Sequence, residues 1–226
     1  SVVNATGVFA DKILQMDNPE ARKMIQPSQG IHLVMDNSFL GGDDALMIPE
    51  TSDGRVLFAV PWEGKLVVGT TDTLVKKPKM EPRPLASEIN FILETASNYL
   101  VKPPKRSDVL SVFAGLRPLA APKEGSTKTK EISRSHKVIV SKSKLITITG
   151  GKWTTFRKMG EDTVDAHFKN NNLTAIESTS ASKHLHGYSL KEVDGHLKLY
   201  GSDASFILDL QKQNPEWAER IHEDYP

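Results

Sequence analysis

Apolar residues along the first 120 positions either alternate with polar ones or form short runs, and turn-forming residues separate the runs. This pattern predicts short β-strands, because alternating apolar positions place one face of a strand in a core. Three consecutive strands, joined by turns at Asp53-Gly54 and Glu63-Gly64, are expected over residues 46–49, 55–61 and 65–70. Their regular spacing indicates an antiparallel meander.

Further strands are expected on both sides of this meander. Residues 31–35 predict a buried strand that begins after a break at Pro27-Ser28-Gln29-Gly30, and residues 109–119 predict another. Shorter strands are expected over residues 1–4, 137–140 and 145–149, the last two forming a hairpin.

Helices are expected where apolar residues recur at three- and four-residue spacing, over residues 8–16, 86–100, 154–168, 203–210 and 215–223. A stretch rich in Ser and Thr, Thr174–Lys183, separates the last two helices from the rest. This stretch predicts a linker between domains, and the mixture of strands and helices predicts a fold that combines α and β elements.

Composition narrows the kinds of chemistry that the chain can perform. The 226 residues are 38% hydrophobic and 25% charged, with a formal net charge of +1 and no cysteine. Disulfides, thiolate metal sites and thiol catalysis are therefore excluded. Lysine and arginine are dispersed, which argues against nucleic-acid binding, and His184 and His186 lack carboxylates at a convincing metal-ligand spacing. The chain opens on Ser1 in an apolar strand, so we expect it to be a piece of a longer protein.

The segment Leu145–Arg157 is the strongest candidate for a ligand site. A β-branched strand runs into Gly150-Gly151, Lys152 follows, and Thr154 and Thr155 begin the next helix. Two glycines allow close approach of the backbone, and a helix N-terminus with a lysine beside it stabilises negative charge. Alone, these residues equally fit a plain strand–turn–helix joint or a site for any anion.

Two more segments contain candidate polar groups. Arg117 follows an apolar strand and precedes Pro118, so its guanidinium could hold a phosphate or carboxylate, or simply pair with a carboxylate at the sheet end. His32 begins a predicted strand and could accept a proton from an alcohol, although a lone histidine is more often structural. Arg134, in a basic loop, could join an anion site or be solvated.

Four ordered motifs resemble those of the FAD-dependent glycerol-3-phosphate dehydrogenases, within the D-amino-acid-oxidase-like flavoproteins. The motifs are Val2–Asp11 (VVNATGVFAD), Gly115–Leu119 (GLRPL), Ser133–His136 (SRSH) and Gly150–Arg157 (GGKWTTFR). The chain departs from the family at Gln29-Gly30-Ile31-His32, where the family usually has lysine at the first position and Ser or Thr at the third.

The resemblance implies roles for individual residues. It implies that Arg117 and Arg134 bind the substrate's phosphate, that His32 lies in the substrate pocket, and that Lys152 lies beside both flavin and substrate. The residues implied to contact FAD are Ala5, Thr6, Gly7, Gly150, Gly151, Lys152, Trp153, Thr154 and Thr155. Arg117, Lys152 and His32 are the residues expected to be catalytic.

The resemblance also implies a division into domains. Residues 1–24 and 113–172 are expected to belong to a Rossmann-like FAD-binding domain, and residues 25–112 to an antiparallel substrate-binding domain. Residues 183–226 are expected to begin a helical C-terminal domain. The family's Gly-x-Gly-x-x-Gly unit does not occur in this sequence, so we expect the isolated chain to bind FAD weakly or not at all and to be inactive.

The implied reaction is oxidation of sn-glycerol 3-phosphate to dihydroxyacetone phosphate, with hydride transfer to FAD and electrons passed on to a quinone. The implied location is cytoplasmic, at the inner face of the cell membrane, and a homodimer is possible. An oxidase of the same fold, or a relative acting on another hydroxy acid or amine, is the alternative among enzymes. A non-catalytic interaction module is the alternative of a different class.

Overall fold

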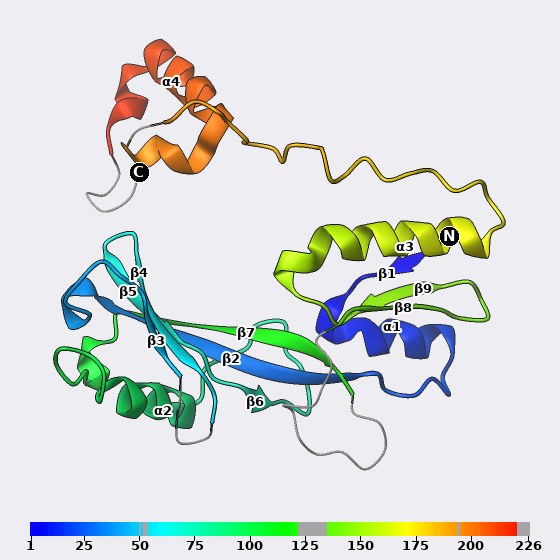
Figure 1. The fold of residues 1–226 in the computed structure, drawn as a ribbon, viewed down its shortest axis with the longest axis horizontal. Helices are drawn as coiled ribbons and strands as arrows, with labels where there is room; N and C mark the ends of the chain where they lie inside the picture. The colour runs from blue at the N-terminus through cyan, green and yellow to red at the C-terminus, as the bar shows by residue number, and fades with distance from the viewer. Residues whose placement is uncertain (50, 52–53, 122–134, 194, 221–226) are drawn as a thin grey trace. The chain divides into compact units, whose positions relative to one another are not determined.

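The computed structural model of this chain describes residues 1–49, 51, 54–121, 135–193 and 195–220 (Figure 1). The chain divides into two compact units, Ser1–Ala175 and Ile176–Pro226. The first unit contains two β-sheets, and the second contains only helical elements among the described residues. Among the described residues, no helix combines the length and apolar character that crossing a membrane requires.

The larger sheet has six strands and is antiparallel at every pairing. Its order is β3-β4-β5-β2-β6, and β7 lies on the other side of β2. β2 and β7 are paired from Ile25↔Ala120 to Val34↔Ser111, which is the longest strand pairing described in this sheet. The strands are β2 (Ile25–Asp36), β3 (Leu46–Ile48), β4 (Leu57–Trp62), β5 (Lys65–Gly69), β6 (Thr73–Leu74) and β7 (Ser111–Ala120).

One face of this sheet packs against helix α2 (Ala86–Ala96) to form the main core. The buried side chains come from alternate strand positions and from one face of the helix, because side chains alternate across a strand and recur at three- to four-residue spacing in a helix. They include Ile31, Leu33, Met35, Leu57, Ala59, Leu66, Val68, Ile89, Ile92, Leu93 and Ala96.

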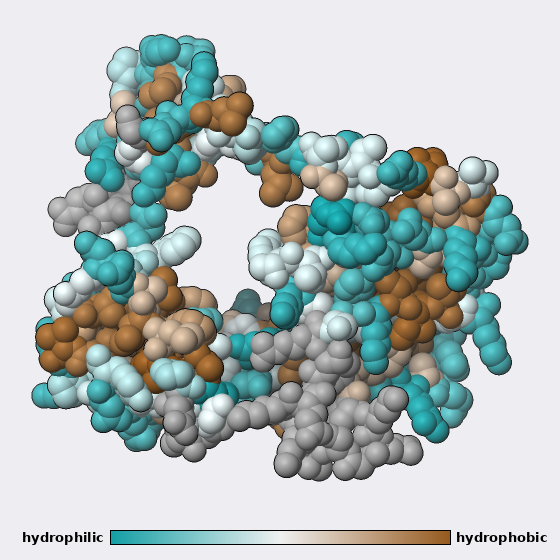
Figure 2. All heavy atoms as spheres, viewed as in Figure 1, coloured by the Kyte–Doolittle hydropathy of each residue, from teal (hydrophilic) through white to brown (hydrophobic). Residues whose placement is uncertain are grey.

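The opposite face of the sheet is open in the described part of the chain. The strand register aligns one row across it, consisting of Met47, Phe58, Gly69, His32 and Phe113. Met47, Phe58 and Phe113 are each about half exposed, and Figure 2 shows apolar surface over β3–β5 on the left of the view. A row of apolar side chains beside a histidine and an arginine is typical of a face that covers a ligand.

The smaller sheet has three strands in the order β1-β9-β8. β1 (Val3–Asn4) and β9 (Ile146–Thr149) are parallel, and β8 (Lys137–Val140) forms an antiparallel hairpin with β9. Helices α1 (Ala10–Asp17) and α3 (Phe156–Asn170) cover opposite faces of this sheet (Figure 1). Short 3-10 turns precede both helices, η1 (Gly7–Phe9) before α1 and η5 (Trp153–Thr155) before α3. Elsewhere in the unit lie the 3-10 turns η2 (Asn37–Phe39) and η3 (Arg106–Asp108).

The second unit contains the 3-10 segment η6 (Gly195–Asp203), helix α4 (Ala204–Gln213) and the turn η7 (Pro215–Ala218). The expected helix over residues 203–210 is confirmed as α4. The expected helix over residues 215–223 is wrong in its described part, because Glu219 is extended (ψ 128°) and ends the turn. Residues from 221 onward lie outside the described part.

The predicted meander is confirmed, with β3, β4 and β5 in consecutive order, and the mixed fold class is confirmed as well. At the turn between β4 and β5, Glu63 and Gly64 both have positive φ, 46° and 73°, as the mirror-image hairpin turn requires. Asp53, in the first predicted turn, lies outside the described residues.

The predicted break at Pro27–Gly30 is wrong, since β2 continues through it. Pro27 lies directly opposite Pro118 of β7. Neither proline has an N–H, so the two can only form the non-hydrogen-bonded kind of antiparallel pair, which loses no ladder bond. The Pro27 carbonyl on the other side accepts a hydrogen bond from the Val75 N–H at 2.9 Å. The partner strand, which sequence periodicity does not reveal, thus allows proline here.

Candidate functional site

The first group of site residues lies where two parallel strands end. β1 and β9 are parallel neighbours, with Val3 opposite Ile146 and Asn4 opposite Thr147. The segments that follow them, Ala5–Gly7 and Gly150–Lys152, therefore leave the sheet at the same edge. Ligands of α/β folds bind outside the carboxyl ends of parallel strands, so these two segments form the natural edge for a cofactor.

Asn4 fixes the geometry of this edge. Its side chain is almost fully buried and donates from Nδ2 to the Ala10 carbonyl at 3.0 Å and to Thr147 Oγ1 at 3.3 Å. Its Oδ1 accepts from the Thr6 hydroxyl at 2.8 Å. One amide thereby joins β1, the start of α1 and β9. Asn4 lies in the first motif, but we assigned it no role from the sequence.

Asp11, the last residue of that motif, has a comparable structural task. Its carboxylate accepts hydrogen bonds from the backbone N–H groups of Met24 at 2.9 Å and Ile25 at 3.2 Å. These two bonds tie the first turn of α1 to the start of β2. The motif therefore links the smaller sheet to the strand that carries His32.

The Gly150-Gly151 turn is confined by its surroundings. Both residues have positive φ, 72° and 78°. A Cβ at Gly150 would lie 2.7 Å from the Ser135 carbonyl oxygen, and one at Gly151 would lie 3.2 Å from His136 Cβ and 2.9 Å from Met159 Cε. Side chains are excluded at both positions for reasons of conformation and of space. The turn is therefore held between the segment at residues 135–136 and helix α3.

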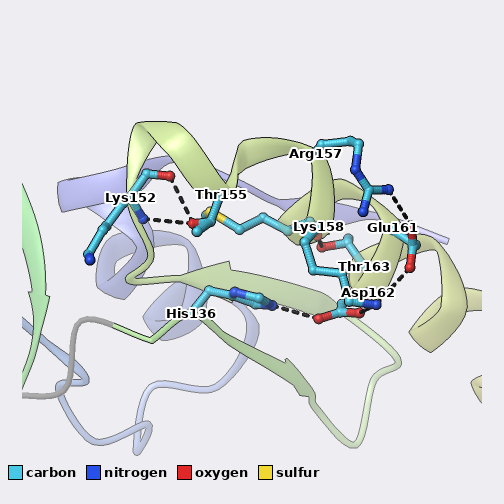
Figure 3. A network of polar contacts seen from close by, with 9 residues as sticks. His136, Lys152, Thr155, Arg157, Lys158, Glu161, Asp162 and Thr163 are labelled. Carbon is cyan, nitrogen blue, oxygen red and sulfur yellow. Dashed lines mark hydrogen bonds and ion pairs between the residues drawn. The ribbon is translucent and has the colours of Figure 1, made fainter. Parts of the chain in front are cut away.

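Lys152, Trp153, Thr154 and Thr155 continue from this turn and are exposed, Trp153 by 89%. The Lys152 N–H donates to Thr155 Oγ1 at 3.1 Å, and the Thr155 hydroxyl donates back to the Lys152 carbonyl at 3.0 Å. Residues 153–155 form a 3-10 turn, and α3 begins at Phe156 rather than at Thr154 as expected. In Figure 3 the Lys152 side chain points away from α3.

A polar network fastens α3 to the segment that precedes β8 (Figure 3). His136 Nε2 lies 2.7 Å from Asp162 Oδ2, and Lys158 Nζ lies 2.8 Å from Asp162 Oδ1 and 2.6 Å from Glu161. Lys158 and then His136 lower the pKa of Asp162 by hydrogen bonding to its charged form. His136 and Asp162 therefore fix the wall against which Gly151 packs, a role that the sequence did not indicate.

The second group of site residues lies on the open face of the six-stranded sheet. Arg117 of β7 is opposite Ser28 of β2, two residues before Gly30. The guanidinium lies directly over Gly30, where a Cβ would be 2.7 Å from Arg117 Cζ. Because residue 30 has no side chain, the guanidinium can occupy the space above its Cα.

Three neighbouring residues after β5 hold the guanidinium. Arg117 Nη1 donates to the Thr71 carbonyl at 3.0 Å, and Nη2 donates to Thr70 Oγ1 at 3.0 Å. Asp72 Oδ1 lies 3.6 Å from Nη1 and also accepts a short hydrogen bond from the Ser28 hydroxyl. Arg117 therefore has a carboxylate partner, as one of the two sequence interpretations required, but it also remains about a third exposed. A guanidinium has five N–H donors, so fixing its plane also fixes the directions of its other donors.

His32 lies two residues along β2 from Gly30, on the same face. Its ring stacks on Phe113, with 5.0 Å between ring centroids and 14° between planes, and it covers Gly69, where a Cβ would lie 2.8 Å from His32 Cγ. Burial lowers the pKa of His32, and the positive charge of Arg117 lowers it further. His32 is therefore neutral at neutral pH and can accept a proton.

The two departures from the family pattern, Gln29 and Ile31, lie on the core side of β2. Ile31 is fully buried in the main core, and Gln29 is 94% buried with its amide directed to Glu88. Alternation along the strand leaves Gly30 and His32 on the open face. The two departures therefore change residues that pack beneath the open face and leave the residues on that face, Gly30 and His32, unchanged.

The expected site residues thus form two groups. Arg117 and His32 lie together on the six-stranded sheet, while Ala5–Gly7 and Gly150–Thr155 lie together at the edge of the smaller sheet. Arg134 lies outside the described residues. Residues that contribute but were not expected to are Asn4, Gly30, Gly69, Thr70, Thr71, Asp72, Glu88, His136 and Asp162. Of these, only Asn4, Gly30 and His136 lie in segments compared with the family pattern above.

The smaller-sheet edge fits a cofactor on observations of the structure itself. Gly7 has a positive φ of 58°, and a Cβ built there would find no atom within 4 Å. Thr149, directly before the Gly-Gly turn, has a buried hydroxyl without a hydrogen-bond partner among the described residues. Open space beside a glycine turn and an unpaired buried hydroxyl are features that a bound ligand would complete.

A family model described as FAD dependent oxidoreductase (DAO) matches residues 1–157, which include both groups. The chain belongs to this family. The fold and the resemblance inferred from the four motifs are thereby confirmed.

Relatives extend this result. Mitochondrial glycerol-3-phosphate dehydrogenase of Macaca fascicularis is 45% identical over 190 residues, covering 82% of this chain and 26% of that protein. A probable mitochondrial glycerol-3-phosphate dehydrogenase of Dictyostelium discoideum is 36% identical, covering 100% of this chain and 39% of that protein. The solved glycerol-3-phosphate dehydrogenase of Bacillus halodurans, complexed with FAD, matches with a TM-score of 0.80 at 32% identity, over 96% of this chain and 46% of that one. The chain thus spans about a quarter to under half of the length of these relatives.

Proposed function

We propose that this family member is part of an FAD-dependent glycerol-3-phosphate dehydrogenase. The observation that carries the proposal is the guanidinium of Arg117, held over Gly30 beside His32 on an open sheet face. A fixed cation and a neutral base on one face suit a substrate that has an anionic group and a hydroxyl. The relatives named above support glycerol 3-phosphate as that substrate.

In this proposal Ala5–Gly7 and Gly150–Thr155 hold FAD. Bound FAD would supply the acceptor for the hydride on C2 of the substrate. Lys152, exposed beside the turn, would add positive charge where negative charge develops. The glycines would let the backbone approach the cofactor closely.

Arg117 binds the phosphate in this proposal and thereby orients the C2 hydroxyl toward His32. His32 accepts the hydroxyl proton, because its lowered pKa keeps the ring uncharged at neutral pH. Dihydroxyacetone phosphate is the product. Phe113, stacked on His32, limits the positions that the ring can take. Arg134 remains a proposed second phosphate ligand.

The proposed domain division follows the two sheets except at β7, most of which falls in the FAD-binding part although it pairs with β2. Residues 25–112 supply β2 to β6 and most of the core, and they would form the substrate-binding domain. Residues 1–24 and 113–172 supply β1, β8, β9, α1 and α3, and they would belong to the FAD-binding domain. β7 leads from one to the other, and residues 183–226 would begin the C-terminal helical domain.

The test replaces Arg117 or Lys152 by alanine in the full-length, FAD-loaded protein. Loss of a preorganised charge contact is expected to lower kcat/KM for glycerol 3-phosphate by about 100-fold or more. Unchanged kinetics in both variants would favour a non-catalytic interaction module instead. The FAD content of each variant is the control.

The electron acceptor and the location are further parts of the proposal. We expect turnover with a quinone analogue and little with oxygen, and the reverse would indicate the oxidase. The protein would act at the surface of the membrane that holds its quinone, at the cytoplasmic face of the cell membrane as expected above. Several relatives are named mitochondrial, so cell fractionation would distinguish the two compartments.

A further inference from the structure

A buried carboxylate lies behind Arg117, on the helix side of the sheet. Glu88 is in the first turn of α2 and is only 4% exposed. Its Oε2 accepts hydrogen bonds from the Leu85 N–H at 2.9 Å and from Gln29 Nε2 at 2.8 Å, and its Oε1 accepts from the Thr71 hydroxyl at 3.0 Å. A carboxylate at so buried a position needs hydrogen-bond donors, and it orients the donors that surround it.

The charge state of Glu88 determines how its neighbours are oriented. Burial raises the pKa of Glu88, but hydrogen bonds from Leu85, Thr73, Gln29 and Thr71 more than offset burial and place it below the ordinary value. An ionised carboxylate only accepts hydrogen bonds, so the Thr71 hydroxyl must donate to it. The same hydroxyl oxygen accepts from the Ile31 N–H at 3.1 Å.

Thr71 connects the two sides of the sheet edge. Its side chain is 1% exposed and is held by Glu88 and β2, while its carbonyl accepts from Arg117 at 3.0 Å. The adjacent Thr70 hydroxyl accepts from the other terminal nitrogen of Arg117. Holding the Thr71 side chain therefore fixes the residue whose carbonyl accepts from the guanidinium and which adjoins the other two partners, Thr70 and Asp72.

We propose that Glu88 is a positioning residue that fixes Thr71 and thereby aims the Arg117 guanidinium at the anionic group of the substrate. This inference rests on the proposed function, in which Arg117 binds phosphate. Glu88 itself does not touch the substrate, because it lies on the core side of β2. Gln29 contributes by donating one amide to Glu88 and to the Arg83 carbonyl, at 2.8 and 3.0 Å.

The test uses Glu88→Gln in the full-length, FAD-loaded protein and measures competitive inhibition by inorganic phosphate. Glutamine keeps the size of the side chain but has one acceptor oxygen instead of two, so it cannot accept from Leu85 and Gln29 at one position and from the Thr71 hydroxyl at the other. We expect the inhibition constant for phosphate to rise about tenfold, with kcat at saturating substrate changed much less. Glu94→Gln, at an exposed position of the same helix, is the matched control and should change neither.

A double-mutant cycle separates positioning from general structural support. In an Arg117→Ala background, Glu88→Gln should change the inhibition constant by less than about twofold, since the group that it acts through is gone. An equal effect in both backgrounds, or no effect in either, would overturn the inference. If the Glu88→Gln protein does not retain FAD, the inhibition constant for phosphate is measured in Thr71→Val instead. This variant removes the hydroxyl that donates to Glu88 and leaves Glu88 in place, and the same rise of about tenfold is expected. If Arg117→Ala alone leaves phosphate inhibition unchanged, the proposed phosphate site itself is wrong.

Discussion

At the scale of single residues, the open sheet face depends on which positions lack a side chain. Arg117 and His32 each lie over a glycine, Gly30 and Gly69 respectively. Each glycine lies on a neighbouring strand. Gly30 is on β2, which pairs with the strand of Arg117, and Gly69 is on β5, which pairs with the strand of His32. The two glycines thus leave room for these polar groups, which side chains also hold, Thr70 and Asp72 for Arg117 and Phe113 for His32.

Replacing Gly30 by alanine should impair binding rather than folding. The new Cβ would meet the far end of a flexible arginine, which can move aside, so we expect stability to change by less than about 1 kcal/mol. The displaced guanidinium should raise KM for glycerol 3-phosphate about tenfold. Gly115→Ala is the matched control, because Gly115 is opposite Gly30 and no atom lies within 4 Å of its Cβ. Equal KM values for the two variants would contradict the prediction.

The pKa of His32 is expected to lie below its ordinary value of about 6.5. Burial is the larger cause, so Arg117→Ala should raise this pKa only part of the way back. Nuclear magnetic resonance of the His32 ring protons during a pH titration measures this pKa in the unsubstituted protein and in Arg117→Ala. Below about pH 6.5 the unfolded chain binds a proton at His32 that the folded chain does not. The contribution of this residue to the free energy of unfolding therefore decreases as the pH is lowered from about 6.5 to the folded pKa. A His32 pKa above 6.5 would contradict the assignment of a neutral base.

At the scale of elements, the site is made from segments that follow strands. β1 and β9 end at one edge of the smaller sheet, and the segment after β5 holds Arg117 of β7. These segments are positioned by buried side chains from other elements, Asn4 at the first place and Glu88 at the second. Buried residues outside the proposed ligand contacts therefore determine how the proposed ligand-binding residues lie.

The Gly-Gly turn should be sensitive to any side chain. Gly150→Ala places a Cβ at positive φ and 2.7 Å from the Ser135 carbonyl oxygen, and we expect a loss of about 3 kcal/mol in unfolding free energy. Gly64→Ala has the same sign of φ, 73°, but no atom within 4 Å of the Cβ, and it should cost only about 1 kcal/mol. Urea denaturation of the two variants measures the difference. Equal losses would show that strain alone acts at residue 150.

At the scale of the whole molecule, the described structure contains one edge of the proposed cofactor site. Ala5–Gly7 and Gly150–Thr155 are in place, while the sequence contains no Gly-x-Gly-x-x-Gly to hold a pyrophosphate. The chain spans 46% of the Bacillus halodurans enzyme, which was solved complexed with FAD. Most of the contacts that such a cofactor needs would therefore have to come from residues other than these 226.

We accordingly expect the purified 226-residue chain to carry no stoichiometric FAD. The visible absorbance spectrum after incubation with excess FAD and gel filtration is the measurement, with free flavin as the reference. A flavin-to-protein ratio near one would contradict the expectation. It would also mean that the two glycine turns and their helix bind the cofactor without the pyrophosphate unit.

The sequence by itself determined most of the elements and the family. Alternation predicted β3 to β5, helical spacing predicted α1 to α4, and Gly150-Gly151 marked the turn before α3, because these signals depend on neighbours close in the chain. The four motifs, in order, led to the FAD dependent oxidoreductase family. Local patterns failed where a distant strand decided the outcome, as at Pro27, whose place in β2 depends on Pro118.

Only the tertiary structure decided which polar residues act together. Glu88, Thr71 and Arg117 are separated by 17 and 46 residues along the chain, and no spacing rule relates them. Their contacts depend on the register of β2 with β7 and on the packing of α2 against the sheet. A hydrogen bond forms only when donor and acceptor come within about 3 Å, and for residues so far apart that is a property of the fold. The sequence therefore identified Arg117, and the structure identified the residues that hold it.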